Sequence, residues 1–408
     1  MPIVLQINVC NNVYSTGKIA SEIGDEAINE GWESYIAYGR SCAPNRSEAI
    51  RIGTSIDINI HAIEQRIFDN TGLGFCSSTA TRQLVEKIKQ IRPNIIHLHV
   101  LVGYYINLKV LFKYLATSGI PVVWTLHSCW EFTGHCTHFD YQGCNKWIEG
   151  CHHCPIKNEY PESYLFDRSR KNYEEKKRLF TSVPNLHIVA VSEWLSNNVS
   201  RSFLQSFPCT VINNGIDVSI YKPSQNSEYL RDKYNLRNCS IALGVASAWT
   251  KKKGFEDYIR LSSILPENVK IVMVGLSKDQ IKSLPATIIG IERTTNRQEL
   301  VDWYSLASVV LNLSYEESFG LTTVEGYACG TPSIVYNKTA SPELIKEGTG
   351  YVVNAGDIQS VRDRINQIVD CGKEQFVRRC RKVAEEAYDK DKNYKKYIEL
   401  YNKILSVQ

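Results

Sequence analysis

The chain has no long apolar run. A membrane-spanning helix needs about 18 or more predominantly apolar residues in a row, and even the apolar stretch 101–115 is interrupted by Lys109 and Lys113. Residues 1–9 lack the basic flank and the small-residue cleavage site of a signal peptide, and their apolar character predicts a buried first strand. We therefore expect a cytoplasmic protein that contacts a membrane at most peripherally, at its inner face.

Internal repeats, low-complexity tracts and a strong charge imbalance are also missing. The 43% apolar and 22% charged residues describe an ordinary globular protein, and a length of 408 residues predicts two domains. The formal net charge of +4 permits contact with phosphates but gives no indication of nucleic-acid binding. The 13 cysteines are an odd number without a secretory signal, which argues against a disulfide framework and for a reducing compartment.

Short apolar runs alternate with stretches of helical periodicity. One such series covers residues 3–191 and a second covers residues 241–335, while the stretch between them, 213–227, is rich in Asn, Gly, Pro and Ser. The alternation is typical of βα units, which build parallel sheets covered by helices on both faces. The fold class is therefore α/β with two sheets.

We place the domain boundary near residue 208. The predicted units are a Rossmann-like N-terminal domain over 1–208 with a cysteine-rich insertion at 129–160, a second Rossmann-like domain over 209–388, and a terminal helix over 389–408 that packs back on the first domain. In such sheets ligands bind beyond the carboxyl ends of the strands.

The most informative block is residues 313–332, which follow a predicted strand and open a helix. Gly320 allows a tight turn there, and the free N–H groups at the start of the helix favour a bound diphosphate. Glu317 and Glu325 flank this turn and can accept hydrogen bonds from sugar hydroxyls. Spacing alone does not separate this site from two solvated surface glutamates.

Two motifs in this sequence resemble retaining glycosyltransferases of family 4. The first, Glu317-Ser-Phe-Gly-Leu-Thr-Thr-Val-Glu325, is similar to the E-x7-E element of that family. The second, Asn213-Asn-Gly-Ile-Asp-x-x-x-Tyr221-x-Pro223, is similar to its signature just after the interdomain junction. The resemblance covers essentially the whole chain and implies the GT-B fold, in which two Rossmann-like domains face each other across a cleft.

The resemblance also implies that the first domain, 1–208, binds the acceptor and that the second, 209–388, binds the donor. Glu325 is expected to bind the ribose hydroxyls of the donor, and Glu317 is expected to contact the donor sugar. The backbone groups expected to contact sugar and phosphate belong to Phe319, Gly320, Leu321, Thr322 and Thr323.

The family places basic residues on the pyrophosphate in an R-x-x-x-x-K-G loop, and residues 248–254 correspond to that loop. Lys253 matches the lysine, but Ala248 stands at the arginine position. We assign donor binding to Lys252 and Lys253, and we leave open whether Lys251 or Lys252 supplies the second charge. Three solvated surface lysines are the alternative.

In the first domain, Gly17 follows the first strand where the family has a glycine-rich turn that faces the donor and the acceptor, so the resemblance implies donor binding for Gly17, although one glycine before a helix is a weak signal. His127 ends a predicted strand at the position where relatives keep a histidine against the donor sugar. Ser128 stands where the family often has aspartate. We favour a sugar contact for His127 over a purely structural role.

The implied activity is transfer of a hexose-type sugar from a nucleotide-sugar, with UDP favoured over GDP. The acceptor is expected to be a saccharide, free or lipid-linked, in the assembly of a surface or capsular polysaccharide. Family members are thought to retain configuration through an oxocarbenium-like transition state without a protein nucleophile. Glu317, His127 and Lys253 then act by orienting the sugar and stabilising charge, and not as a glycosidase acid/base pair.

Two other readings stay open. A nucleotide-sugar epimerase or a phosphorylase shares the fold, and would consume donor without an acceptor product or would depend on phosphate. A catalytically silent nucleotide-sugar-binding partner of another transferase is favoured by the altered Ala248 and Ser128 positions.

No catalytic divalent ion is expected. A metal-bridged donor calls for an Asp-x-Asp element after an apolar strand, and the match at Asp389-Lys390-Asp391 lies in a polar run before the last helix. A structural zinc ion is a separate hypothesis, because Cys151-x-x-Cys154 has metal-ligand spacing. The four candidate ligands, which are either a zinc site or reduced thiols in a packed loop, are Cys136, Cys144, Cys151 and Cys154.

Overall fold

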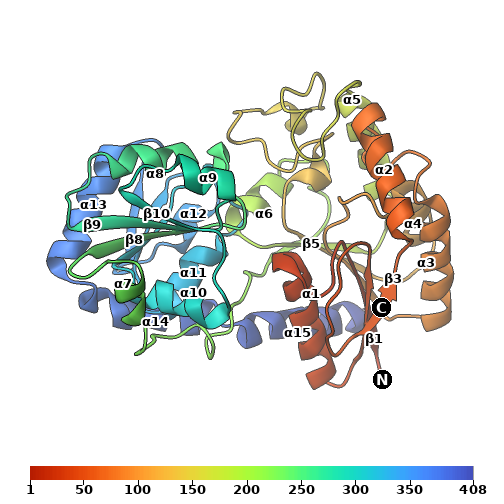
Figure 1. Ribbon diagram of the computed structural model, residues 1–408. Coiled ribbons are helices and arrows are strands. Elements are labelled where there is room, and N and C mark those ends of the chain that lie inside the picture. Colours follow the sequence, from red (N-terminus) through yellow and green to blue (C-terminus); the bar gives the residue numbers. More distant parts are fainter. Residues whose placement is uncertain (408) are drawn as a thin grey trace. The chain divides into compact units, whose positions relative to one another are not determined.

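The computed structural model describes residues 1–407, which form two compact α/β units (Figure 1). The first unit consists of Met1–Asn213 and Asp391–Gln408, and the second of Asn214–Lys390. The chain thus enters the second unit shortly after the predicted boundary at residue 208. It returns to the first unit for its last helix.

The first unit is built on a seven-stranded parallel sheet with strand order β3-β2-β1-β4-β5-β6-β7. The strands are β1 (Ile3–Asn8), β2 (Glu33–Tyr38), β3 (Glu48–Arg51), β4 (Ile95–Leu98), β5 (Val122–Leu126), β6 (Leu186–Ala190) and β7 (Cys209–Val211). The strand order reverses between β1 and β4. The carboxyl ends of these two strands are therefore the ligand-binding edge expected of such a sheet.

Helices cover both faces of this sheet, which explains why its central strands are nearly continuous apolar runs. Figure 1 shows α1 and α15 on one side and α3 and α4 on the other. The helices are α1 (Tyr14–Asn29), α2 (Ser55–Phe68), α3 (Ser78–Ile91), α4 (Leu108–Leu115), α5 (Ser169–Phe180), α6 (Glu193–Val199) and α15 (Lys390–Ser406).

The terminal helix α15 is held to the first sheet by its tyrosines. Tyr394, Tyr397 and Tyr401 are buried in one apolar cluster with residues of β1, β4 and β5. The Tyr401 hydroxyl also lies 2.6 Å from His97 Nδ1 on β4. The helical spacing of these aromatics predicts one buried face of the helix, and this face packs on the sheet.

The second unit contains a six-stranded parallel sheet with order β10-β9-β8-β11-β12-β13. Its strands are β8 (Ser240–Val245), β9 (Val269–Val274), β10 (Ile288–Ile291), β11 (Val309–Asn312), β12 (Ser333–Tyr336) and β13 (Gly350–Val353). Its helices are α7 (Tyr229–Lys233), α8 (Phe255–Ser262), α9 (Lys278–Ser283), α10 (Arg297–Leu306), α11 (Leu321–Ala328), α12 (Ser341–Leu344), α13 (Ile358–Cys371) and α14 (Glu374–Ala387). Here the order reverses between β8 and β11.

The chain segments that enter and leave the second unit are joined directly. Ile216 and Asp389 form a β-bridge, and Lys390 Nζ lies 2.7 Å from Asp217 Oδ2. A Cβ on Gly215 would collide with Lys390 Cα. Gly215 and Asp217 of the junction motif are therefore structural residues, because they hold together the segments that enter and leave the second unit.

Candidate active site

The loops that follow β8 and β11 lie against each other at the reversal point of the second sheet. The Tyr315 N–H donates a hydrogen bond to the Lys252 carbonyl at 2.8 Å. Gly254 has a φ of +75°, and a Cβ there would collide with the Leu313 carbonyl oxygen. The glycine after the lysines thus lets the short 3-10 turn Lys251–Lys253 approach the loop that carries the glutamates.

Two of the three lysines pair with the glutamates of that loop. Lys253 Nζ lies 2.6 Å from Glu317 Oε1, and Lys252 Nζ lies 3.0 Å from the buried Glu316. Lys251 instead forms an exposed pair with Glu256 on α8. Lys252 therefore lies beside Lys253 at the loop that carries the glutamates, and Lys251 does not; which of Lys251 and Lys252 supplies the second charge to the pyrophosphate stays a prediction.

Gly320 begins α11 in a backbone conformation that favours glycine, with φ at +107° and ψ at 59°. No side chain caps this helix. The Thr323 N–H bonds to the Gly320 carbonyl at 3.1 Å, and the first-turn amides before it, with the helix dipole, favour an anion. The side chains of Phe319 and Thr323 are buried, the ring packing against Tyr388 and the hydroxyl accepting a hydrogen bond from Asn312. Of these two residues, only backbone groups can serve a ligand.

Glu325 is held by two tyrosines. The Tyr304 hydroxyl donates to Glu325 Oε2 at 2.7 Å, and Tyr221 also hydrogen-bonds to this carboxylate. Burial, followed by the charge of Glu325, raises the pKa of both hydroxyls above their ordinary range, so both remain donors. Tyr221 belongs to the junction motif, and Tyr304 lies inside α10 with no signal in the sequence. The two motifs therefore meet at Glu325.

Gly17 is not where the sequence placed it. It was expected in a turn before the first helix, but α1 already begins at Tyr14, and Gly17 is buried in its first turn. A Cβ at this position would lie 3.2 Å from the Cys10 carbonyl oxygen and 3.3 Å from the Asn12 nitrogen. The glycine allows the helix to start directly against the loop after β1. The weak signal of a single glycine explains the error.

His127 is the end of a row of side chains that crosses three neighbouring strands. Gln6 Nε2 on β1 donates to the Ala20 carbonyl at 2.8 Å, which leaves Gln6 Oε1 as the acceptor for His99 Nε2 at 2.9 Å. His99 Nδ1 must then accept, and His127 Nε2–H donates to it at 3.2 Å. This assigns the proton of His127 to Nε2 and leaves Nδ1 as a hydrogen-bond acceptor.

Burial lowers the pKa of His127 to about 4. Burial likewise holds the pKa of His99 well below its usual range. Both rings are therefore neutral at physiological pH, and His127 presents a lone pair and not a positive charge. Such a group orients a hydroxyl and does not neutralise a phosphate.

A carboxylate does lie beside Ser128, where the family often has aspartate. The Ser128 hydroxyl donates to Glu131 Oε2 at 3.3 Å, and burial raises the pKa of Glu131 to about 7. The buried Lys176 Nζ lies 2.5 Å from the Trp130 carbonyl and 3.5 Å from the centre of the Trp130 ring. Neither Glu131 nor Lys176 was identified from the sequence, because their partners come together only in the fold.

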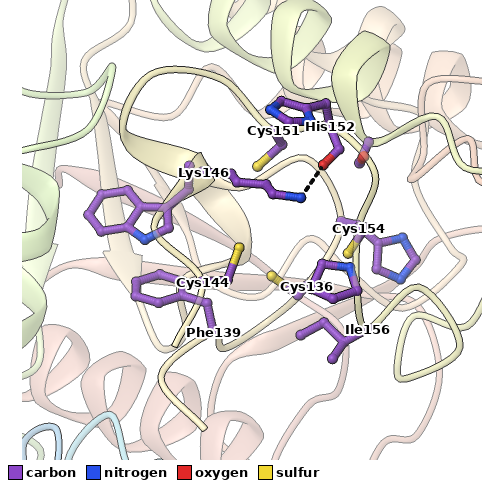
Figure 2. Close-up of a pocket in the computed structure, with 12 residues that line it drawn as sticks. Cys136, Phe139, Cys144, Lys146, Cys151, His152, Cys154 and Ile156 are labelled. Carbon is purple, nitrogen blue, oxygen red and sulfur yellow. Dashed lines mark hydrogen bonds between the residues drawn. The ribbon is translucent and has the colours of Figure 1, made fainter. Parts of the chain in front are cut away.

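Four of the five cysteines of the insertion, Cys136, Cys144, Cys151 and Cys154, line one small cavity (Figure 2). All are free thiols. Across residues 1–407, no group of three or more His, Cys, Asp or Glu side chains is already arranged as a metal-ion site. Asp389-Lys390-Asp391 lies where the chain leaves the second unit, and Lys390 pairs there with Asp217. The absence of a catalytic metal ion stays a prediction.

Comparison with known proteins agrees with this architecture. The pattern described as Glycosyltransferase Family 4 matches residues 17–220, half of the chain, and the pattern described as Glycosyl transferases group 1 matches residues 226–390. The putative colanic acid biosynthesis glycosyl transferase WcaC of Escherichia coli (strain K12) is 23% identical over 378 residues, which are 87% of this chain and 88% of that protein. D-inositol 3-phosphate glycosyltransferase of Mycolicibacterium smegmatis is 26% identical over 39% of each chain.

Solved structures share the fold over the full length. Sucrose-phosphate synthase from Thermosynechococcus elongatus superposes with a TM-score of 0.72 at 15% identity, covering 100% of both chains. Anabaena Alr3699/HepE in complex with UDP gives a TM-score of 0.68 at 15% identity, over 99% of this chain and 100% of that one. No helix in residues 1–407 combines the length and apolarity needed to cross a bilayer. The matched family and the two parallel-sheet units together show that this chain belongs to glycosyltransferase family 4 and is a glycosyltransferase of the GT-B type.

Proposed function

We propose that the protein transfers a hexose-type sugar from a nucleotide-sugar to a saccharide acceptor, with retention of configuration. The observation that carries the proposal is the reversal point of the second sheet, where Lys253, Glu317 and the uncapped start of α11 occur together. Cationic ammonium and free N–H groups suit a diphosphate, and a carboxylate suits sugar hydroxyls. Glu325, oriented by its two tyrosines, is then the acceptor for ribose hydroxyls.

The reaction breaks the bond between the anomeric carbon and a diphosphate oxygen and forms a bond from that carbon to an acceptor oxygen. The acceptor hydroxyl proton passes to the departing diphosphate. Negative charge grows on the diphosphate during the step, and Lys253 with the first-turn amides of α11 stabilises it without reorganising. Glu317, already fixed by Lys253, holds the sugar in place. His127 offers Nδ1 as an acceptor for a sugar hydroxyl.

UDP is the preferred nucleotide in this proposal. Support comes from the HepE structures, whose titles name UDP and UDP-glucose as bound molecules. Assembly of a surface or capsular polysaccharide is supported by the name of WcaC, a colanic acid biosynthesis glycosyl transferase. A solved structure of WaaG, described as involved in lipopolysaccharide biosynthesis, is a further relative of this kind, with a TM-score of 0.64.

We also propose that the first unit rests on an anionic membrane surface, where a lipid-linked acceptor is presented. The apolar strip of this unit comprises Ile56, Ile60, Ile63 and Phe68 on α2 with Tyr164, Leu165 and Phe166 from the loop beside it, all exposed. Phe166 stacks on Phe68 with ring centres 5.9 Å apart. Large apolar side chains in contact with water mark binding surfaces.

Exposed cations lie beside the apolar strip, together with carboxylates. The exposed positions of α2 carry no carboxylate and include Arg66, which pairs with Glu162 at 3.9 Å. After Phe166 come the exposed Asp167, Arg170 and Lys171, of which Arg170 pairs with Glu174 at 3.2 Å. Apolar side chains beside cations bind the boundary of an anionic bilayer through both burial and electrostatic attraction.

The test of the transfer reaction is product analysis. The full chain is incubated with UDP- and GDP-hexoses and with saccharide acceptors in the presence of EDTA, and the anomeric configuration of the product is read by NMR. We expect one nucleotide class to yield an acceptor-linked product with the configuration of the donor. An inverted product would contradict retention. Donor consumption without an acceptor-linked product would favour an epimerase, and tight donor binding without turnover would favour the silent partner.

A further inference from the structure

Four thiols from separated parts of the insertion gather around one cavity. Cys136, Cys144, Cys151 and Cys154 all line it, and Figure 2 shows their sulfur atoms turned toward a common space. The cavity has about 20 Å³ of open space, enough for a single particle the size of a water molecule. The thiols of Cys136 and Cys154 are already within hydrogen-bonding distance of each other.

The backbone around the cavity donates hydrogen bonds to sulfur. The Gly134 N–H lies 3.2 Å from Cys151 Sγ, and the Ile156 N–H bonds to the Cys154 thiol two residues earlier. A Cβ on Gly134 would lie 2.8 Å from Cys151 Cβ and would collide with the Ser169 carbonyl. N–H groups aimed at sulfur stabilise a thiolate, which is the form of cysteine that binds metal ions.

Positive charge surrounds the same cavity. Lys146 lines it, and Lys146 Nζ donates to the His152 carbonyl at 3.1 Å (Figure 2). It also donates to the His153 carbonyl at 3.0 Å. The buried Lys176 interacts electrostatically with Cys151 and Cys136. Four thiolates around a divalent cation leave a net charge of about −2, and the Lys146 ammonium that lines the cavity offsets part of it.

The insertion contains little regular secondary structure of its own. Between β5 and α5, the described chain contains only two three-residue 3-10 turns, Trp130–Phe132 and Lys146–Ile148. Its apolar centre is a contact of three rings, with Phe139 stacked on Trp147 at 4.7 Å and Phe132 packed against both. Segments with so small a core commonly need a disulfide or a metal ion for stability.

We propose that the insertion binds one structural zinc ion through Cys136, Cys144, Cys151 and Cys154. No ready metal-ion site exists among residues 1–407, so the four side chains have to draw inward as the ion binds and their protons pass to solvent. Binding is thereby coupled to ordering of the insertion. His135 also lines the cavity, but it is not counted among the ligands, because its Nδ1 lies 2.6 Å from Asp69 and its Nε2 lies 3.4 Å from the Glu159 carbonyl, so both ring nitrogens have protein partners. This inference does not depend on the proposed transfer reaction.

The test is the metal content of the purified full chain, produced with zinc in the medium and measured by elemental mass spectrometry. We expect about one zinc ion per chain. The double variant Cys151→Ser, Cys154→Ser loses the zinc, while the matched control Cys42→Ser, Cys371→Ser, which changes two exposed cysteines elsewhere, keeps it. A folded wild-type chain with zinc far below one per chain overturns the proposal.

A second readout covers the case in which the serine double variant fails to fold. A high-affinity chelator is added to the wild-type chain, and thiol reactivity and limited proteolysis are followed. We expect four additional reactive thiols and new cleavage confined to residues 129–160, reversed by adding zinc back. If chelation changes neither, or if the four cysteines prove to be paired as disulfides, the proposal is wrong.

Discussion

His99 stands between Gln6 and His127, with one ring nitrogen 2.9 Å from Gln6 Oε1 and the other 3.2 Å from His127 Nε2. Gln6 lies in β1, and His99 and His127 directly follow β4 and β5; these three strands are neighbours in the sheet but lie far apart in the sequence. The orientation of the buried Gln6 amide therefore decides which ring nitrogen of His127 carries no proton. The following predictions depend on this row and on the paired residues of the second unit.

The substitution Gln6→Leu is predicted to impair His127 indirectly, through His99. The buried His99 Nε2–H loses its acceptor, at a cost of about 1–3 kcal/mol in stability, and the proton assignment along the row is no longer fixed. We expect kcat/KM to fall, and His127→Ala to add little once Gln6 is changed. Equal and additive losses in the double variant would show that the two residues act independently.

The pH dependence of the enzyme should show no titration of His127 near 6.5. Burial lowers its folded-state pKa from 6.5 to about 4, so between these values the unfolded chain binds more protons than the folded one and stability rises with pH. That contribution is complete above pH ~6.5 and is lost as pH falls through ~4. NMR titration of the His127 ring measures this directly, and a midpoint near 6.5 would contradict the burial argument.

The lysines of the 3-10 turn should differ sharply in effect. Lys253→Ala removes the partner of Glu317 and a charge assigned to the diphosphate, and we expect donor affinity to fall by about tenfold or more. Lys251→Ala is the matched control, because Lys251 pairs with Glu256 on the surface and exposed pairs contribute little. Calorimetric titration with UDP distinguishes them. Similar losses in both variants would mean that the turn acts only through its total charge.

The tyrosines at Glu325 should affect donor binding through that carboxylate. Tyr304→Phe removes one buried hydrogen bond, with an expected loss of about 1 kcal/mol in stability and a weaker affinity for UDP. In the Glu325→Gln background, Tyr304→Phe should reduce the affinity for UDP by a smaller factor. An unchanged effect of Tyr304→Phe in both backgrounds would assign the tyrosine to packing alone.

The apolar strip should carry membrane binding. Ile60→Asp with Ile63→Asp places two charges on the exposed face of α2, and we expect co-sedimentation with vesicles of anionic phospholipid to be lost. Val407→Asp, at an exposed terminal position, is the control and should still sediment. If the wild-type chain does not bind anionic vesicles, or binds neutral ones equally well, the proposed role of the strip is wrong.

Periodicity and short motifs predicted the two parallel sheets, because buried strands and helix faces leave a local pattern. The residues of the candidate site could be predicted only in part from such patterns. Glu317 and Lys253 lie in recognisable loops, but three adjacent lysines look alike until the fold directs Lys251 to α8 and the other two to the glutamates.

Partners that are distant in sequence left no signal at all. Tyr304 reaches Glu325 across the packing of α10 on α11, and Gln6 reaches His99 across 93 residues. Gly17 was misplaced because a helix can begin before a glycine when the preceding loop packs close to it. Such contacts depend on the strand order of the sheet, which periodicity does not contain.

The most direct test of the central claim is nucleotide-dependent thermal stabilisation. The full chain and its Glu325→Ala variant are melted with UDP-, GDP-, dTDP- and CMP-sugars in the presence of EDTA. We predict that one nucleotide class, with UDP favoured, raises the melting temperature of the wild type and fails to do so with Glu325→Ala. If no nucleotide-sugar shifts the wild-type melting temperature at saturating concentration, the donor site assigned to the second unit is contradicted.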